Sequence, residues 1–363
     1  MLKLKDTIQA FFEIPLIKRI TRLWYLIFLG IASFNRFFSI FYHILSFFTF
    51  SREQQAVLRG RYKYYRNLKR KSNSRVELRR NIHRIEKGLL MRPGRDSFAR
   101  NYIQETIISY KLALQQYSDN RLNVDSDEIN WAHDVLMRYF STVKLTDKIR
   151  KAKNEFETQY HLTLEEKTDV EMAPYKIGIS DKSPVTYDDL LNLNQRRKSV
   201  RWFKQKNVPR DLIDKAIMVA CQSPSACNRL PYEYRIFDDP ERVKEVGKIP
   251  FGASGYYQNI PVIVVIIGKL NHFFSSRDRH IIYIDASLSA MSFMLALETL
   301  GLSSSVINWP DFEPVEMKMK KTLKLKIDER PVMLIAVGYP DPEGKVAFSQ
   351  RKSLNSIRNY NQT

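Results

Sequence analysis

Length, composition and charge restrict the class of protein. The chain has 363 residues, 44% of them hydrophobic, which is enough for two or three compact units with sizeable cores. Its 12 Gly and 15 Pro exclude a low-complexity chain. The only cysteines, Cys221 and Cys227, exclude a disulfide framework and indicate a reducing compartment, and the six histidines lack the spacing of metal ligands.

The formal charge of +20 predicts anionic partners such as a phosphate cofactor, acidic lipid or nucleic acid. Residues 51–95 contain 15 Lys and Arg against three acids, a net charge of +12. More than half of the excess therefore follows directly after an apolar stretch. No basic-region heptads, zinc-finger spacing or RNA-binding signature accompany it, so we expect no nucleic-acid partner.

The N-terminal stretch has the composition of a membrane-associated segment. Residues 1–22 are amphipathic, and Leu23–Phe50 contains many aromatic residues and one formal charge, Arg36. A single helix through these 28 residues would be about 42 Å long, enough to cross a bilayer core of about 30 Å with tilt. Placing Arg36 at the bilayer centre would cost about 2.5–3.5 kcal/mol.

Three interpretations of this segment remain open from the residues alone. It forms an interfacial helix or re-entrant hairpin, a tilted single span, or a helix buried within protein. A cleaved signal peptide is not expected, because the apolar run is too long and no small-residue cleavage site follows it. Under a membrane interpretation, residues 1–95 contact anionic headgroups at the cytoplasmic face of the inner membrane.

The next part of the chain predicts helices. Val76–Leu90 has helical spacing with Gly88 as a candidate stop, and Ser97–Tyr117 is amphipathic. Asp127–His161 predicts a second long helix with a break near Lys144. We expect four parts in the chain: a membrane-associated segment (1–50), a basic helical region (51–165), a linker (166–185) and a C-terminal domain (186–363).

Helices and strands alternate in the C-terminal domain. Pro261–Gly268 is a continuous apolar run that predicts a buried central strand. Ile281–Leu300 is apolar or small all round, which predicts a buried helix ended by Gly301. Further helices are expected at Asp188–Asn194, from Pro209 to about Gln222, and at Pro240–Val246, and further strands at Tyr232–Phe237, Ser303–Asn308 and Pro331–Val337.

Two segments carry the chemistry of a candidate site. Gln195–Phe203 places four cations around Ser199, and Arg forks together with a hydroxyl suit a phosphate group. Ser223–Pro231 is a Pro/Ser/Asn loop between a helix and a strand, which offers backbone N–H groups to a flat polar ligand.

In this order and spacing, the two segments resemble the nitroreductase family of flavin enzymes. That family opens with an Arg-Arg-x-Ser-x-Arg-x-Phe pattern and continues with Pro-Ser-x-x-Asn-x-Gln-Pro-Trp. The resemblance runs from about Thr186 to the C-terminus. This sequence departs from the family at Leu230, where Gln is usual, and at Tyr232, where Trp is usual.

The resemblance implies an α+β fold, a nitroreductase-like mixed sheet flanked by helices, in a homodimer with two FMN sites. Position by position, the implied cofactor contacts are the opening motif (Arg197, Lys198, Ser199 and Arg201), the loop (Pro224, Ser225 and Asn228), Asn308, and the last phosphate-binding segment (Arg351, with Lys352 as its alternate). Trp309 replaces a usually small residue and is expected to narrow the pocket.

The implied activity is an NAD(P)H-dependent flavin oxidoreductase that passes hydride through flavin N5 to an electron-poor organic acceptor. No side chain acts as a catalyst, because the flavin carries the chemistry. One alternative is a flavin enzyme that works oxidatively on a glycan- or lipid-linked substrate. A further alternative is a membrane-associated scaffold whose flavin site is lost.

A second resemblance concerns the helical region. The string Ile82–Leu89 resembles one in nitroreductase-like proteins from bacterial cell-surface polysaccharide clusters, which implies a role in polysaccharide biosynthesis. Within it, His83 and Glu86 form either part of a site or an ordinary pair on a helix surface.

Overall fold

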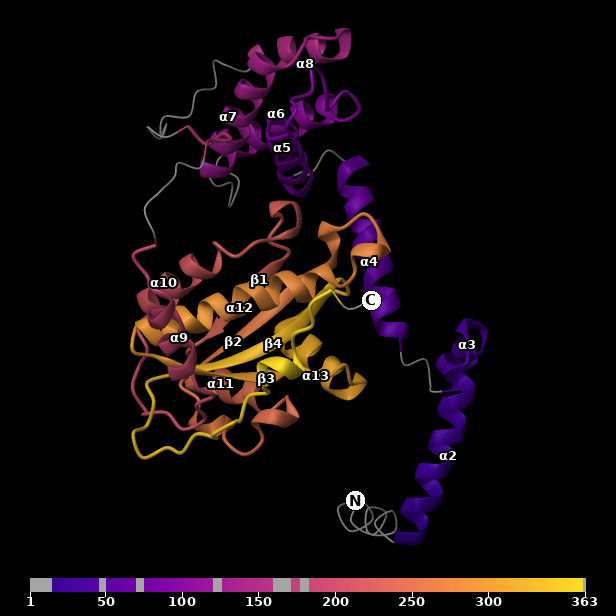
Figure 1. Cartoon of the computed structure of the whole chain (residues 1–363), viewed down its shortest axis with the longest axis vertical. Coiled ribbons are helices and arrows are strands. Elements are labelled where there is room, and N and C mark those ends of the chain that lie inside the picture. The colour runs from indigo at the N-terminus through magenta and orange to yellow at the C-terminus, as the bar shows by residue number, and fades with distance from the viewer. Residues whose placement is uncertain are drawn as a thin grey trace. The chain divides into compact units, whose positions relative to one another are not determined.

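The computed structural model describes residues 15–45, 50–69, 75–119, 126–158, 171–176 and 183–361 (Figure 1). The chain divides into two compact units, Met1–Ala56 and Val57–Thr363. The second unit contains both the helical region and the sheet domain, so these two parts fold together. The domain boundaries predicted at 50, 165 and 185 stay predictions.

The described residues of the first unit form helix α2 (Pro15–Ser33), helix α3 (Arg36–Leu45) and the start of α4 (Ser51–Lys69). Asn35 separates α2 from α3, because its side-chain oxygen accepts hydrogen bonds from the N–H groups of Phe37 (2.9 Å) and Phe38 (3.1 Å), as an N-cap does. The rings of Phe28 and Tyr42 lie 5.6 Å apart, so the helices pack as a hairpin. The alternative of one continuous helix through this segment is therefore wrong.

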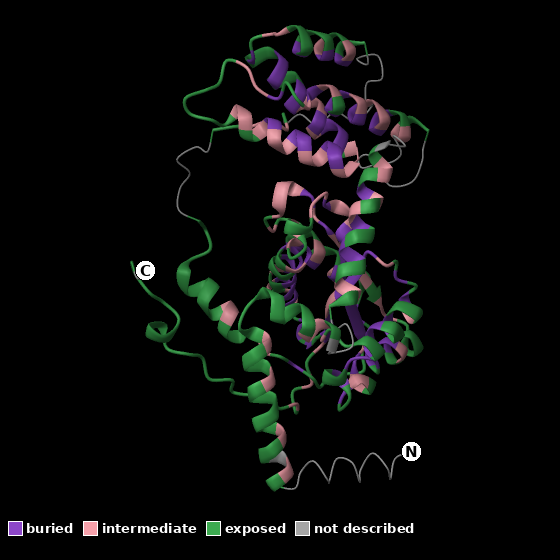
Figure 2. Cartoon of the chain, turned by 90° about the vertical axis from the view of Figure 1, so that its right-hand side faces the viewer, coloured by how far each residue is buried: buried purple, intermediate pink, exposed green. Residues whose placement is uncertain are grey.

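The hairpin leaves its apolar side chains exposed, as Figure 2 shows. Trp24 and Leu26 are each 70% exposed and Phe34 is 79% exposed, so these side chains are not buried within the hairpin itself. Among the described residues, one helix, Ser276–Thr299, is long and apolar enough to cross a bilayer. That helix belongs to the core of the sheet domain, so it gives little evidence for a span.

The helical region of the second unit consists of α4 (Ser51–Lys69, from Val57 on) and a four-helix core. The core comprises α5 (Arg75–Leu89), α6 (Ile103–Ser118), α7 (Ser126–Thr142) and α8 (Asp147–Glu157). Fully buried Leu78, Ile82 and Ile85 from α5 pack against apolar residues of the other three helices. The predicted break near Lys144 is confirmed between α7 and α8.

Two predictions in this region were wrong. The helix expected from Ser97 begins only at Ile103, because Ala99 has a left-handed φ of 60° that a helix does not accommodate. Gly88 lies inside α5 instead of ending it. A Cβ atom at Gly88 would lie 2.1 Å from Cε2 of Phe98, so the glycine permits close packing.

The sheet has four strands in the order β1-β2-β4-β3, and every neighbouring pair is antiparallel. The strands are β1 (Tyr232–Phe237), β2 (Val262–Lys269), β3 (Ser303–Asn308) and β4 (Glu329–Gly338). The expected mixed sheet is therefore wrong for these strands, because each lies beside neighbours of opposite direction. The parallel contribution among described residues is a bridge between Ser199 and Ser304.

Helices cover both faces of the sheet, which confirms the α+β class. Alternate residues of buried β2 face opposite ways, as the strand period of two requires. Val262, Val264 and Ile266 pack with α10 (Arg210–Ala220) and α12 (Ile281–Thr299). Their neighbours Ile263, Val265 and Ile267 pack with α11 (Pro240–Gly247) and α13 (Glu313–Leu323).

Helix α12 is buried on one side and open on the other. Its exposed apolar residues, Ile284 (51% exposed), Leu288 (45%) and Met291 (37%), recur at helical spacing. The expectation that this helix is buried all round is therefore wrong for a single chain. Gly301, with φ of +74°, lies just after the helix, as expected for a C-terminal glycine.

Candidate functional site

The first candidate segment lies along the free edge of β3. It follows α9 (Tyr187–Arg196), which begins with a capping box between Thr186 and Asp189. Val200 donates its N–H to the carbonyl oxygen of Ser304 at 3.0 Å, which fixes the segment against the strand. Val200 is buried while Ser199 and Arg201 on either side are exposed.

Three of the four cations of this segment lack a counter-charge among the described residues. Arg197, Lys198 and Arg201 form no ion pair with any carboxylate that the structure describes, whereas Arg196 lies 3.7 Å from Glu298. Burial raises the pKa of Glu298, although a hydrogen bond from Ser303 and the charges of Arg196 and Arg197 oppose the rise. Three unpaired cations beside an exposed hydroxyl are a donor set that fits the phosphate of a mononucleotide.

The second candidate segment is the loop that joins α10 to β1, and a buried carboxylate holds it. Asp285 of α12 is 3% exposed, and its Oδ2 accepts hydrogen bonds from Ser225 Oγ (2.7 Å) and the Ala226 N–H (2.9 Å). Ser225 Oγ in turn accepts the N–H of Leu230 at 2.8 Å. The Ser225 hydroxyl therefore holds the loop in shape, and Pro224 before it is exposed.

The same loop has a strained backbone. Cys227, Asn228 and Leu230 have left-handed φ values of 54°, 49° and 44°. Asn tolerates this region, but Cys and Leu each lose roughly 1–2 kcal/mol there. Arg79 of α5 holds the loop from the other side, because its Nε donates to the carbonyl oxygen of Asn228 at 2.8 Å.

Asn308 ends β3 and is exposed, but the next residue turns inward. Trp309 is 9% exposed, and its indole N–H donates to Glu316 Oε1 at 2.6 Å within the core. The expectation that Trp309 narrows the pocket is therefore wrong, because this hydrogen bond and the surrounding core hold the ring inside.

The predicted site residues lie on separate parts of the C-terminal domain. Described contacts join residues 197–201 to β3, and residues 224–230 to α12 and α5. Arg351 and Lys352 lie in an exposed C-terminal tail after β4 and form no ion pair with described residues (Figure 2). These ten residues stay predicted cofactor contacts.

Sequence reasoning missed two residues that shape the site. Asp285 had a signal, because it is an acid within a helix of apolar and small residues. Arg79 had none, because it is one of 15 cations in residues 51–95.

His83 Nδ1 and Glu86 Oε2 lie 3.2 Å apart on α5, and the Trp131 indole N–H donates to Glu86 Oε1 at 2.8 Å.

Comparisons with known proteins concern the C-terminal part of the chain. Residues 238–339 match the model of the Nitroreductase family. A protein named NADH dehydrogenase/NAD(P)H nitroreductase from Methanothermobacter thermautotrophicus is 25% identical over 174 residues, which is 46% of this chain and 84% of that protein. Pig iodotyrosine deiodinase 1 is 25% identical over 197 residues, which is 47% of this chain and 66% of the deiodinase.

Similar solved structures include an FMN-dependent nitroreductase from Clostridium difficile, with a TM-score of 0.41 and 22% identity over 48% of this chain and 99% of that one. An NAD(P)H:FMN oxidoreductase from Staphylococcus epidermidis has a TM-score of 0.42 and 21% identity, over 48% of this chain and 96% of that one. The family model and the sequence relatives support the resemblance to the nitroreductase family in the C-terminal part of the chain. The residues from Arg197 to Asn228 and those from Arg351 on lie outside residues 238–339, which the family model matches.

The role of Asp285 is testable. We expect Asp285→Asn to lower the free energy of unfolding by about 1.5–3 kcal/mol, because two donors lose a charged acceptor in a buried place. The measurement is the midpoint of urea unfolding. The control is Ser223→Ala, which removes a neutral hydrogen bond to Ser292 (2.9 Å) and should cost about 1 kcal/mol or less. Equal costs for the two variants would contradict the role given to Asp285.

Proposed function

We propose that residues 186–363 form a nitroreductase-like domain that binds FMN, and that the protein uses NAD(P)H to reduce an electron-poor organic acceptor. The observation that carries the proposal is the row of unpaired cations, Arg197, Lys198 and Arg201, beside Ser199 at the edge of β3. The names of the sequence relatives support the choice of NAD(P)H as the electron donor.

The residues of this chain bind and orient; the bound FMN supplies the hydride-transfer chemistry. Arg197, Lys198 and Ser199 hold the phosphate through charge-assisted hydrogen bonds. Arg201 would lie beside the ring system of a bound FMN, where a fixed cation would stabilise negative charge. The loop of Asn228 and the backbone of Asn308 shape the ring site.

The proposed assembly is a homodimer, and exposed apolar surface supports it. Beside the open face of α12, Met218 and Val219 of α10 are 69% and 49% exposed. In the C-terminal tail, Phe348 is 85% and Ile357 66% exposed. Large exposed apolar side chains that gather on one face favour an interface. A tail that lies on a second copy would bring Arg351 and Lys352 to that copy's flavin site.

The flavin site is tested on purified full-length protein in detergent. The wild type should be yellow, and the double variant Arg197→Gln, Lys198→Gln should bind FMN about tenfold more weakly or worse, because it loses charge-assisted hydrogen bonds to the phosphate. FMN titration of the apoprotein, followed by quenching of flavin fluorescence, measures the affinity. The control is Arg210→Gln, which changes an exposed arginine paired with Asp238.

The direction of the reaction is read from the same sample. Anaerobic NADH or NADPH should bleach the flavin absorbance of the wild type. Absorbance that persists would favour the oxidative alternative, and a colourless protein that binds no FMN would favour the scaffold.

Equal FMN affinity in the double variant and the control would contradict the proposed phosphate site.

We also propose that the protein lies on the cytoplasmic face of the inner membrane, through residues 1–95. The exposed apolar side chains of the α2–α3 hairpin, including Trp24 and Phe34, need a non-aqueous partner. The net charge of +12 in residues 51–95 favours anionic headgroups. A role in the synthesis of cell-surface polysaccharide is proposed from the string Ile82–Leu89 alone.

Membrane association is tested by sedimentation with phosphatidylglycerol-containing vesicles. The full chain should pellet with these vesicles, and pellet less with vesicles of phosphatidylcholine alone. A deletion of residues 1–50 should stay in the supernatant with its flavin, because it has lost the apolar hairpin. A deletion variant that still pellets with the vesicles would contradict the proposal.

A further inference from the structure

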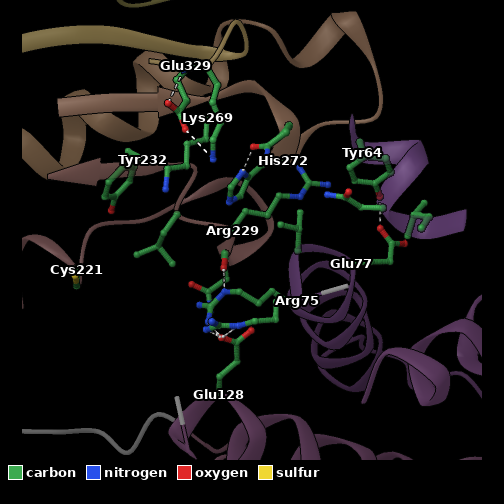
Figure 3. Close-up of a pocket in the computed structure, with 18 residues that line it drawn as sticks. Tyr64, Arg75, Glu77, Glu128, Cys221, Arg229, Tyr232, Lys269, His272 and Glu329 are labelled. Atoms are coloured by element: carbon green, nitrogen blue, oxygen red, sulfur yellow. Dashed lines mark hydrogen bonds and ion pairs between the residues drawn. The ribbon is translucent and has the colours of Figure 1, made fainter. Parts of the chain in front are cut away.

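A cavity of about 660 Å³ lies within the second unit, beside the loop that Asp285 holds. Helices α4 and α5 form one wall, and residues 228–232 with the end of β2 form the other (Figure 3). Its volume is that of a site for a small molecule. Asn228 and Leu230, which belong to the predicted flavin loop, also line it.

Helix α4 is held firmly as a wall of this cavity. Gly60 is buried, and a Cβ atom there would lie 2.7 Å from the carbonyl carbon of Leu270, so only glycine permits this approach. Lys63 pairs with buried Asp328, and Arg61 Nε donates to the carbonyl oxygen of Phe274 at 3.1 Å. The cavity is therefore built by contacts from several positions along the helix.

Arg229 is a buried cation without a counter-charge. It is 6% exposed, and its Nε has no hydrogen-bond partner among the described residues. Its guanidinium lies 5.1 Å from the centroid of the Phe273 ring, and it forms no ion pair with a described carboxylate. Asp278 acts on it only from beyond ion-pair distance. A buried charge that stays unpaired is costly, so a partner from outside the chain is needed.

The other cations around the cavity already have carboxylate partners. Arg75 and Arg79 contact Glu128, the latter at 3.6 Å. Lys269 pairs with Glu233, and Lys326 lies 3.7 Å from Glu329. Figure 3 shows Arg229 near the centre of these groups, with Lys269 and His272 on one side and Arg75 with Glu128 on the other. Arg229 is therefore the guanidinium that is open to a ligand among the described lining residues.

The remaining carboxylate near Arg229 is also engaged. Glu77 accepts the hydroxyl of Tyr64 and lies 2.7 Å from Arg80 Nη1. Burial and the neighbouring Glu77 raise the pKa of Tyr64, so its hydroxyl stays protonated. Burial, together with the charges of Lys269, Arg229 and Arg79, lowers the pKa of His272 to about 3. The imidazole is therefore neutral, and the surroundings of the cavity are electropositive.

We infer that this cavity binds the carboxylate or phosphate group of a small molecule, with the Arg229 guanidinium as its cation. The planar fork of arginine matches the paired oxygens of either group. Because Asn228 and Leu230 border the cavity, the bound molecule is the acceptor substrate, and an anionic aromatic or aliphatic acid fits the space. The assignment as acceptor rests on the proposed function, whereas the oxyanion site does not.

The test uses full-length, flavin-containing protein in detergent and isothermal titration calorimetry. The probes are benzoate and phenyl phosphate, with benzyl alcohol as the neutral counterpart. Each anion should bind at least tenfold more tightly than benzyl alcohol. Arg229→Gln should weaken both anions at least tenfold, Arg229→Lys should weaken them less, and the exposed control Arg242→Gln should leave both unchanged. Of the two anions, the tighter identifies which oxyanion the site prefers.

Because Arg229 is buried, thermal unfolding of each variant shows whether a loss of anion binding comes from a loss of the fold. Without ligand, Arg229→Gln and Arg229→Lys should unfold at similar temperatures, because both lose the packing of the arginine side chain and the charge has no carboxylate partner in the chain. An unfolding temperature for Arg229→Gln far below that of Arg229→Lys would mean that the charge has a partner within the chain beyond the Phe273 ring, and would overturn the inference. If Arg229→Gln alone fails to fold, that result overturns the inference for the same reason.

The outcomes also separate this inference from the proposed function. Anions that bind wild type no more tightly than benzyl alcohol, in protein that contains FMN, would overturn the oxyanion site alone. Anions that bind through Arg229 in protein that takes up no FMN would support the oxyanion site and overturn its assignment as the acceptor site.

Discussion

One buried carboxylate connects the parts of the second unit. Asp285 projects from the core helix of the sheet domain and holds Ser225 and Ala226 by two hydrogen bonds. The loop so fixed contains residues with left-handed backbone, which persist only where surrounding contacts determine them. That loop in turn receives Arg79 from the helical region and places Arg229 in a cavity. The ring side of the proposed flavin site and the proposed oxyanion site therefore both depend on this acid.

The net charge of +20 does not show which cations are paired with carboxylates and which are not. Most cations around the cavity pair with carboxylates, and such pairs hold helices and strands together. The cations at the two proposed binding places, Arg197, Lys198 and Arg201 in one and Arg229 in the other, form no ion pair with a described carboxylate. Unpaired cations at those places favour anionic ligands, a phosphate in the first case and an oxyanion of a smaller molecule in the second.

Local patterns predicted most elements of the fold, and long-range contacts account for what was missed. The apolar run of β2 and the break after α7 were evident, because burial and periodicity are properties of neighbouring residues. The hydrogen bond between Ser225 and Asp285 joins residues 60 positions apart, and no local pattern predicts that these two residues pair. Asn35 acts as a cap inside an aromatic stretch, where hydrophobicity alone suggested one helix. Arg229 is one of 59 Lys and Arg residues in the sequence, and its burial in the structure is what distinguishes it from most of them.

The central claim is that the C-terminal domain holds a flavin mononucleotide, and the most direct measurement is the identity of the chromophore. Full-length protein purified in detergent is denatured, and the released small molecule is identified by mass spectrometry and quantified against the chain. The account predicts FMN at about one molecule per chain. Release of no flavin, or of a dinucleotide in its place, would contradict a site built around one phosphate at residues 197–201.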